Sequence, residues 1–328
     1  MTSPLYPLTF EPRFKERVWG GRQLERLYGK PLPASHPIGE SWEITDRPGD
    51  ISVITNGPFA GRDLRWLMEN HRAELLGDAL SQGDRFPLLI KLLDAREKLS
   101  LQVHPPAHVA AALGGEPKTE LWFIADAEPG AMLYVGLKRG VTRAEFERRI
   151  QDGTVAECFH GVPVKAGDSM FLPSGRVHAI GAGLVIFEIQ QNSDTTYRVF
   201  DWHRMGLDGK PRELHVPQSL ASLDFADFEP GLVQSHTHDS GERKLRALTD
   251  NDLFAVDLAE TPGATILSHA DGRLQILGMI TGSAEVRSAA LPTPIELRAG
   301  QFCLFPATCE QAKIATSPGC RFLQIRPA

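Results

Sequence analysis

The sequence predicts a mainly β protein with a few short helices, and two observations support this fold class. The 328 residues include 30 Gly and 24 Pro, which separate many short runs rich in Val, Ile, Leu and Phe. Runs punctuated in this way are typical of strands joined by turns. An internal repeat is the second observation. Because 42% of the residues are hydrophobic, a chain of this length can bury a large core.

The repeat indicates two related β units. Residues 165–179 read KAGDSMFLPSGRVHA and residues 298–312 read RAGQFCLFPATCEQA, so the two segments align without a gap. They share the Gly and Pro positions of a turn–strand–turn unit, although two such turns can match by chance in a chain rich in Gly and Pro. The second copy has Gln311 where the first has His178. If the first unit binds a metal, we expect the second to have lost that ability.

The pattern of apolar residues and turn signals gives the elements in order. Six strands are expected before residue 200, over residues 41–45, 87–95, 98–104, 120–127, 169–174 and 184–192. Three helices are expected, over residues 61–76, 107–113 and 142–152. The last begins with a capping box of Thr142 and Glu145 and ends at Gly153. Several more strands are expected in the last third of the chain.

Charge and composition exclude some classes of function. The formal net charge of −6 does not favour binding to nucleic acid or to an anionic membrane surface. The N-terminus lacks a basic segment followed by an apolar run, and no window is apolar enough for a membrane span, so we expect a cytoplasmic protein. The four cysteines form no C-x-x-C pair, which predicts reduced, structural thiols.

A polar row follows the alternation of one predicted strand. In LSLQVH, the side chains of Ser100, Gln102 and His104 point to one face, opposite to the apolar residues of the strand. A buried imidazole or amide without a partner is costly, and a metal ion would satisfy it. Glu120 begins the next strand, so an imidazole, an amide oxygen and a carboxylate come together as ligands suited to Zn²⁺ and, less selectively, to Mn²⁺ or Co²⁺.

The segment from Gly167 to His178 supplies another ligand. Its spacing, G-x-x-x-x-x-P-x-G-x-x-H, resembles a metal-binding motif of the cupin superfamily, whose members fold as small β-barrels. Two features depart from the usual cupin pattern. Gln102 stands where a His is expected, and the distance along the chain from His104 to Glu120 is longer than usual.

With these two features, the sequence resembles one family, the type I mannose-6-phosphate isomerases (phosphomannose isomerases) in their short bacterial form. The similar segments, listed in chain order, are VWGG (18–21), IGESWEI (38–44), LIKLLDAREKLSLQVHP (89–105), KTE (118–120), PSGRVHAIG (173–181) and EIQQNSDTTYRVFDW (188–202). The resemblance implies a double cupin, mainly β, with two β-barrel or jelly-roll units and short helical insertions. The expected units are residues 1–228, an N-terminal segment plus the catalytic barrel, and residues 229–328, a degenerate barrel.

The resemblance also implies a site. One Zn²⁺ per chain would be held by four ligands, namely Gln102, His104, Glu120 and His178. Lys118 and Arg198 would be the active-site cations. For contacts with the substrate, weaker expectations fall on four residues, namely Ser100, Lys98, Lys91 and Trp19.

The expected reaction is the interconversion of mannose 6-phosphate and fructose 6-phosphate through an enediolate. The sequence leaves the base open among Lys118 with a lowered pKa, a metal-bound water and Glu188. Other open possibilities are a cupin isomerase for another free or phosphorylated aldose, an iron dioxygenase, and a non-catalytic sugar-binding cupin. The Gln102 ligand argues against the oxygenase, and an intact ligand set argues against the non-catalytic protein. The sequence does not decide between a monomer and a homodimer.

Overall fold

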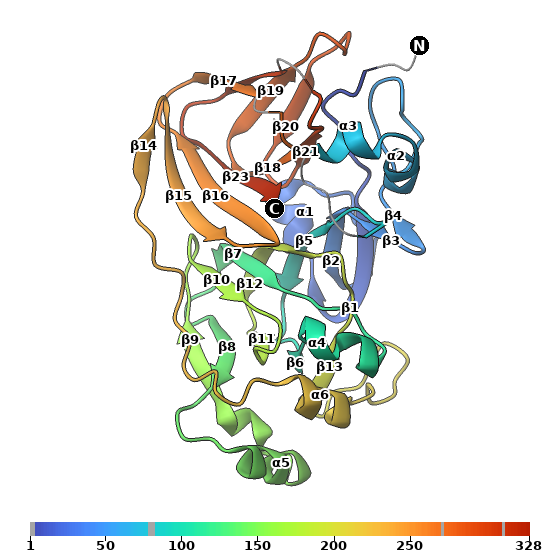
Figure 1. The fold of residues 1–328 in the computed structure, drawn as a ribbon. Coiled ribbons are helices and arrows are strands. Elements are labelled where there is room, and N and C mark those ends of the chain that lie inside the picture. The colour runs from blue at the N-terminus through green and yellow to red at the C-terminus, as the bar shows by residue number, and fades with distance from the viewer. Residues whose placement is uncertain (1–3, 78–82, 270–271, 310–311) are drawn as a thin grey trace.

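The computed structural model of the protein describes residues 4–77, 83–269, 272–309 and 312–328. Gln311, at which the second repeat copy differs from His178, lies outside the described residues. Most elements are strands, and they form two units that lie one beside the other, blue to yellow-green and orange to red in Figure 1. The expected mainly β, double-cupin fold is confirmed.

Two sheets make the first unit. The larger has the strand order β1 (Arg13–Gly21), β2 (Ile38–Ile44), β5 (Leu88–Ala95), β12 (Leu184–Gln191), β7 (Glu120–Ala127) and β10 (Ser169–Leu172). The smaller has the order β13 (Tyr197–Phe200), β6 (Leu101–Val103), β11 (His178–Ile180), β8 (Met132–Leu137) and β9 (Phe159–Pro163). A core between them joins Trp122 and Ile186 of the larger sheet to Leu133 and Ile180 of the smaller one.

The second unit repeats this arrangement. Its larger sheet has the order β14 (His238–Ser240), β15 (Arg243–Asp250), β16 (Phe254–Thr261), β23 (Cys320–Pro327), β18 (Gln275–Thr281) and β21 (Phe302–Phe305). Its smaller sheet has the order β17 (Thr265–His269), β22 (Ala312–Thr316), β19 (Ser283–Arg287) and β20 (Ile295–Arg298). The predicted boundary after residue 228 lies in the segment between β13 and β14, and the boundary itself stays a prediction.

The outer face of the first large sheet packs against the second unit. One core cluster contains Leu92 and Phe187 from the first unit together with Ile276 and Leu304 from the second. Near the N-terminus, Leu8 also pairs with Leu304 as an isolated β-bridge. Burial of this shared apolar surface ties the two units together.

The remaining elements are short. They are α1 (Gln23–Tyr28), β3 (Asp46–Arg47), β4 (Asp50–Ile51), α2 (Leu64–Asn70), α3 (Arg72–Leu76), α4 (Ala107–Ala110), η1 (Ala111–Leu113), α5 (Arg143–Gln151), η2 (Val155–Cys158) and α6 (Val216–Ser222). The helices expected near residues 107–113 and 142–152 are confirmed. Thr142 Oγ1 accepts a hydrogen bond from Glu145 N at 3.2 Å, whereas the Glu145 carboxylate pairs with Arg149, so only one half of the predicted capping box forms.

The single helix expected over residues 61–76 is wrong in two respects, because α2 begins only at Leu64 and the helix is interrupted. The chain breaks it at His71, whose backbone has φ −138° and ψ 29°, and α3 then begins in a new direction. The His71 ring packs against Phe59 and Trp66, at 5.3 and 5.2 Å between ring centroids. This tertiary packing overrides the helical periodicity of the local sequence.

Two expectations about the whole chain can be compared with the structure. All four cysteines lie within the described residues, and each is a buried free thiol. In the part of the chain that is described, every helix falls short of the length and apolar character needed to cross a membrane.

Candidate metal centre and substrate pocket

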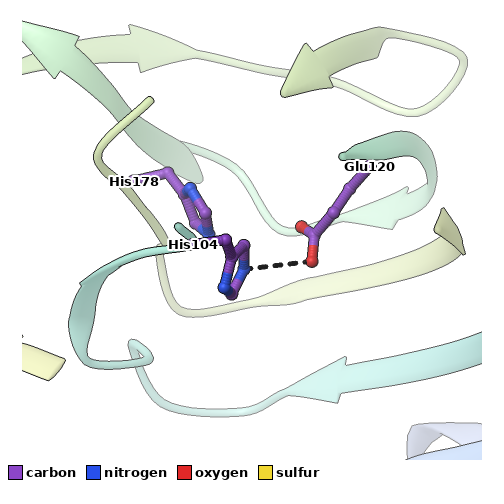
Figure 2. Close-up of side chains that lie close together, drawn as sticks. All are labelled: His104, Glu120 and His178. Carbon is purple, nitrogen blue, oxygen red and sulfur yellow. Dashed lines mark ion pairs between the residues drawn. The ribbon is translucent and has the colours of Figure 1, made fainter. Parts of the chain in front are cut away.

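Three buried side chains converge inside the first unit. His104 follows β6, Glu120 begins β7 and His178 begins β11. Figure 2 shows the three pointing toward one another, and one ligand atom from each lies within 4.8 Å of the others. His104 Nε2 lies 3.1 Å from Glu120 Oε1, and each of the three residues is only 1% exposed. Among the described residues this is the one group of His, Cys, Asp and Glu close enough to hold a metal ion.

The turn at Pro173 to Gly175 joins the segments that carry these residues. Gly175 N donates to His104 O at 2.8 Å, and Lys118 N donates to Ser174 Oγ at 3.1 Å. Gly175 has φ +92°, a conformation that favours glycine, and a Cβ at this position would approach Pro106 Cγ to 3.2 Å. The Gly in the sequence motif therefore lets one turn hold the ends of β6 and β7 beside the start of β11.

Backbone carbonyl groups orient both imidazole rings. His104 Nδ1 lies 2.7 Å from Thr195 O, and His178 Nδ1 lies 2.9 Å from Arg176 O. A carbonyl oxygen can only accept, so each Nδ1 carries the proton and each Nε2 keeps its lone pair for the centre of the cluster. This is the tautomer that a metal-binding histidine needs.

The electrostatics of the cluster also suit a cation. Burial, followed by the charge of Lys118, lowers the pKa of His104. Burial and the neighbouring His104 lower the pKa of His178 to about 3, so both rings are neutral at pH 7. For Glu120, burial opposes ionisation, but the charge of Lys118, together with the contact to His104, outweighs it and holds the pKa of this carboxyl well below its usual value. The cluster thus offers two neutral imidazoles and one carboxylate.

The polar atoms at the centre lack hydrogen bonds among the described residues. His104 Nε2 and both carboxylate oxygens of Glu120 are buried without a partner of hydrogen-bond geometry, despite their close contacts. Unpaired buried polar atoms are costly, and a metal ion would satisfy all of them at once. The donor set of nitrogen and oxygen atoms fits a borderline divalent cation.

Gln102 lies beside the cluster on β6. Its Nε2 lies 3.3 Å from His178 Nε2, and its Oε1 accepts from Ser100 Oγ at 3.3 Å. Because a half-turn of the amide exchanges its nitrogen and oxygen, Gln102 can present its carbonyl oxygen to the same centre. The structure therefore brings together all four residues expected as ligands.

Lys118 lies at the edge of the cluster. Its Nζ is 2.9 Å from Glu120 Oε1, and the side chain is 5% exposed. Burial disfavours its charge, but Glu120, Glu188 and Asp194 outweigh burial and raise the pKa of Lys118. One expected candidate for the base, Lys118 with a lowered pKa, stays a prediction, although the neighbouring acids raise its pKa in this structure.

A cavity of about 510 Å³ opens above this centre. Its wall includes Gln102 and Lys118 at the metal end and three arginines, Arg17, Arg198 and Arg212. Acidic side chains, among them Glu40 and Glu188, lie between the cations. A second and larger cavity, of about 840 Å³, lies around Asp94 and is lined by neither Gln102 nor Lys118. The chemistry therefore points to the smaller cavity as the substrate pocket.

A chain of polar contacts along the sheet floor connects the pocket to the cluster. Glu40 accepts from Arg17 Nε at 2.7 Å, and Lys91 Nζ lies 3.8 Å from Glu40 and 3.2 Å from Glu188. Glu188 also accepts from Trp122 Nε1 at 2.9 Å. The Trp122 ring meets the His178 ring edge-on, with centroids 5.3 Å apart, so Trp122 links the carboxylate to a candidate ligand.

The two carboxylic acids in this series of contacts, Glu40 and Glu188, have opposite pKa shifts. Burial opposes the ionisation of Glu40, but Lys91 and Arg17 outweigh it and lower the pKa to about 2. Burial and the negative charge of Glu120 raise the pKa of Glu188 despite the nearby Lys91. Two carboxyl groups of one pocket are thus separated in acidity, as proton-transfer sites require.

Five of the residues expected as active-site cations or substrate contacts line the cavity, and one does not. Its wall contains Ser100, Lys91, Trp19, Lys118 and Arg198. Lys98 is not, because its ammonium group lies over the Trp202 ring, 3.6 Å from the ring centroid. The expectation for Lys98 stays a prediction, and cation–π attraction explains where its charge lies in this structure.

Sequence reasoning missed Arg17, Glu40 and Arg212. The first two lie in or beside segments quoted for other reasons, VWGG and IGESWEI, and they pair across β1 and β2. A signal existed there, since Glu40 directly precedes the strand predicted over residues 41–45, and a Glu beside a buried strand needs a partner. Arg212 lies in an irregular segment, where it is bound to Asp201 at 2.6 Å, and no sequence pattern pointed to it.

Comparison with known proteins agrees with the geometry. The family model for the catalytic domain of type I phosphomannose isomerase matches residues 8–122. The mannose-6-phosphate isomerase ManA of Bacillus subtilis is 37% identical over 308 residues, which cover 92% of this chain and 93% of the relative. The probable mannose-6-phosphate isomerase GmuF of the same organism is 33% identical and covers 98% and 99% of the two chains.

Solved structures give the same result. The crystal structure of the mannose 6-phosphate isomerase from Bacillus subtilis superposes with a TM-score of 0.89 at 31% identity, covering 98% of this chain and all of the other. With relatives above 30% identity matched along nearly their whole length, the chain belongs to the type I phosphomannose isomerase family.

Proposed function

We propose that the protein is a zinc-dependent aldose–ketose isomerase that interconverts mannose 6-phosphate and fructose 6-phosphate. One observation carries the proposal. A buried set of two imidazoles and a carboxylate, with unpaired atoms at its centre, lies below a pocket lined by cations. The names of the relatives supply the substrate.

The metal would be held by Gln102, His104, Glu120 and His178. Three neutral ligands and one carboxylate would leave a divalent ion with a net positive charge, and Zn²⁺ suits this set. When bound, the ion would act as a Lewis acid toward oxygen atoms of the substrate. The intact ligand set argues against a non-catalytic sugar-binding protein, and the amide ligand argues against an imidazole-rich iron site.

The reaction moves one proton between neighbouring carbons. The open-chain aldose loses the proton at C2, forms an enediolate across C1 and C2, and regains a proton at C1, while the hydroxyl proton of O2 passes to O1. We assign the proton transfer to Glu188, because its pKa is raised and it lines the pocket. A base with a pKa near the working pH can both accept and return a proton efficiently.

Lys118 would stabilise negative charge that develops on the oxygens during this step. Its ammonium group is buried and already aligned by Glu120 at 2.9 Å, so no reorganisation is needed as the charge forms. This role uses the raised pKa of Lys118, which would prevent it from acting as the base.

The phosphate would be bound at the arginine end of the pocket. Arg198 donates from Nη1 to Glu213 O at 2.7 Å, and among the described residues its buried Nε has no partner. Burial and the neighbouring Arg212 lower its pKa, so an anion beside it would relieve the repulsion between two cations. Arg17 and Arg212 line the same pocket and would add charge for a phosphate ester.

A comparison of turnover with three different sugars tests the proposal. The purified protein would be given mannose 6-phosphate, glucose 6-phosphate and free mannose in parallel, and the ketose products would be measured. We expect fructose 6-phosphate from mannose 6-phosphate as the fastest reaction, because the arginines suit a phosphate ester and the relatives are named for this substrate. Faster turnover of free mannose would contradict the assigned phosphate site, and turnover of another aldose phosphate alone would replace the assigned substrate.

A further inference from the structure

The strand register of the second unit identifies the position that corresponds to Glu120. In the first unit, Leu172 of β10 faces Glu120 of β7. The repeat alignment places Leu172 on Phe305, and Phe305 of β21 faces Gln275 of β18. Gln275 therefore stands where the first unit has its candidate metal ligand.

A second path through the sheets leads to the same correspondence. Two residues after Glu120, Trp122 faces Glu188 of β12, which in turn faces Lys91 of β5. Two residues after Gln275, the matching chain of neighbours consists of Leu277 of β18, Gln324 of β23 and Asp257 of β16. The row along the pocket floor thus has a counterpart in the second unit. There, Gln275 replaces Glu120 and Gln324 replaces Glu188.

A cavity of about 350 Å³ lies over this second row. Gln275 and Gln324 line it and are 7% and 5% exposed. Gln275 Oε1 lies 3.1 Å from His269 Nδ1. The Gln324 side chain borders the cavity and is only 5% exposed. It has no hydrogen-bond partner among the described residues. An amide that lines the cavity and makes no hydrogen bond within the described chain can both donate to and accept from a bound molecule.

The chemistry of the lining narrows the class of that molecule. Amides offer donors and acceptors but no charge, so a divalent cation gains little there. Arg326 also lines the cavity, and its charge is compensated by Asp257 at 2.7 Å. Arg243, a further lining residue, is engaged in an interaction within the chain. Leu267 and Ile314 supply apolar wall, and the volume lies at the lower end of small-molecule sites.

We propose that this cavity of the second unit binds an uncharged polyhydroxylated molecule, a hexose or hexitol, through the amides of Gln275 and Gln324. Each hydroxyl group both donates and accepts, as each amide does, and the carbon skeleton packs on the apolar wall. The site lies outside the catalytic pocket and goes beyond the proposed isomerase activity. It rests on that function only in the choice of a six-carbon probe.

Equilibrium dialysis of the full-length protein with radiolabelled mannitol tests the proposal. Mannitol has no carbonyl and no phosphate, so the isomerase reaction cannot consume it. Two variants remove the site differently: Gln324→Leu deletes the amide, and Ser268→Trp fills the mouth from an exposed lining position. Arg198→Ala is the matched change in the first pocket.

We expect saturable binding to the wild-type protein and to the Arg198→Ala variant, about tenfold weaker or lost in Gln324→Leu and in Ser268→Trp. Isomerase activity should stay unchanged in both second-unit variants, which separates this test from that of the proposed function. The inference is overturned if the wild-type protein does not bind mannitol, if binding follows Arg198 instead of Gln324, or if only mannitol 1-phosphate binds.

Discussion

The two units of the molecule differ in charge at equivalent places. In the first, the row along the large sheet consists of Glu120, Trp122, Glu188 and Lys91. In the second, it consists of Gln275, Leu277, Gln324 and Asp257. Both sheets have the same order of strands and the same register, so the backbone alone does not decide the chemistry. Function is determined by which side chains the shared scaffold carries.

The row of the first unit needs compensating charges that the amides of the second unit do not need. Buried carboxylates need compensating cations, and the first unit supplies Lys91 and Lys118, which are 3% and 4% exposed. Such buried ions contribute little net stability, since desolvation offsets their attraction. They hold an arrangement in which Glu120 is ionised while the pKa of Glu188 is raised. In the second unit the two amides need no such compensation, and the one carboxylate of the row, Asp257, pairs with Arg326 at 2.7 Å.

The largest effect is expected from the metal ligands. His178→Ala or Glu120→Ala should lower the bound zinc and reduce turnover to background, because each change removes one of four ligands. The matched change Gln275→Ala, at the position equivalent to Glu120, should leave metal content and turnover as in the wild type. Metal analysis with an isomerase assay checks both, and near-normal activity of His178→Ala would refute the proposed site.

Removal of the assigned base should give the next largest effect. Glu188→Gln should lower kcat by about 10²- to 10⁴-fold while zinc stays bound. Because a base must be ionised, the wild-type rate should rise with pH through the raised pKa of Glu188, and this rise should disappear in the variant. The pH profile of kcat/KM is the measurement. The same profile in both proteins would assign the proton transfer to another group.

A smaller loss is expected at the arginine end of the pocket. Arg198→Ala should retain zinc and lower kcat/KM for mannose 6-phosphate by roughly ten- to a hundredfold, the range for losing a hydrogen bond to a charged group. The loss should be much smaller for free mannose, which has no phosphate to bind. Equal losses for both sugars would show that Arg198 acts on the sugar and not on the phosphate.

The smallest effect concerns the stability of the folded protein. It comes from Asp94, on the opposite face of the strand that carries Lys91. Burial raises the pKa of Asp94 from 3.8 to about 6, although its carboxylate accepts from Gln23 N at 2.6 Å. The folded state therefore binds a proton that the unfolded state releases, and this contribution is complete below pH 4 and lost as the pH rises through about 6.

Asp94→Asn removes that titration and keeps an acceptor for Gln23 N. Between pH 4 and 7, the wild type should lose about 3 kcal/mol at most relative to the variant. Urea unfolding at a series of pH values measures the difference. A constant difference across this range would mean that burial does not raise the Asp94 pKa.

Much of the fold and of the centre could be predicted from the sequence, because both depend on local patterns. Alternation placed Ser100 and Gln102 toward the pocket, and Leu101 and Val103 are buried in an apolar cluster. The G-x-x-x-x-x-P-x-G-x-x-H spacing predicted a turn whose Gly175 does adopt positive φ. These features need only the residue types within a short segment.

Features that depend on distant partners could not be predicted. Lys98 has the same charge whether it faces the pocket or covers Trp202, and only tertiary packing decides this. The helical periodicity around His71 gives no sign of the ring contacts that break the helix. The pKa of Lys118 depends on the adjacent Glu120 and also on Glu188 and Asp194, which come from a later part of the chain.

Metal-dependent turnover is the most direct test of the central claim. Fructose 6-phosphate formation from mannose 6-phosphate would be measured on the purified protein, after chelation, and after zinc is restored, with bound metal quantified in each sample. The account predicts one zinc per chain, loss of turnover with the metal, and recovery when zinc returns. Full turnover by protein shown to be free of metal would contradict it, because His104, Glu120 and His178 would then have no role as ligands in the reaction.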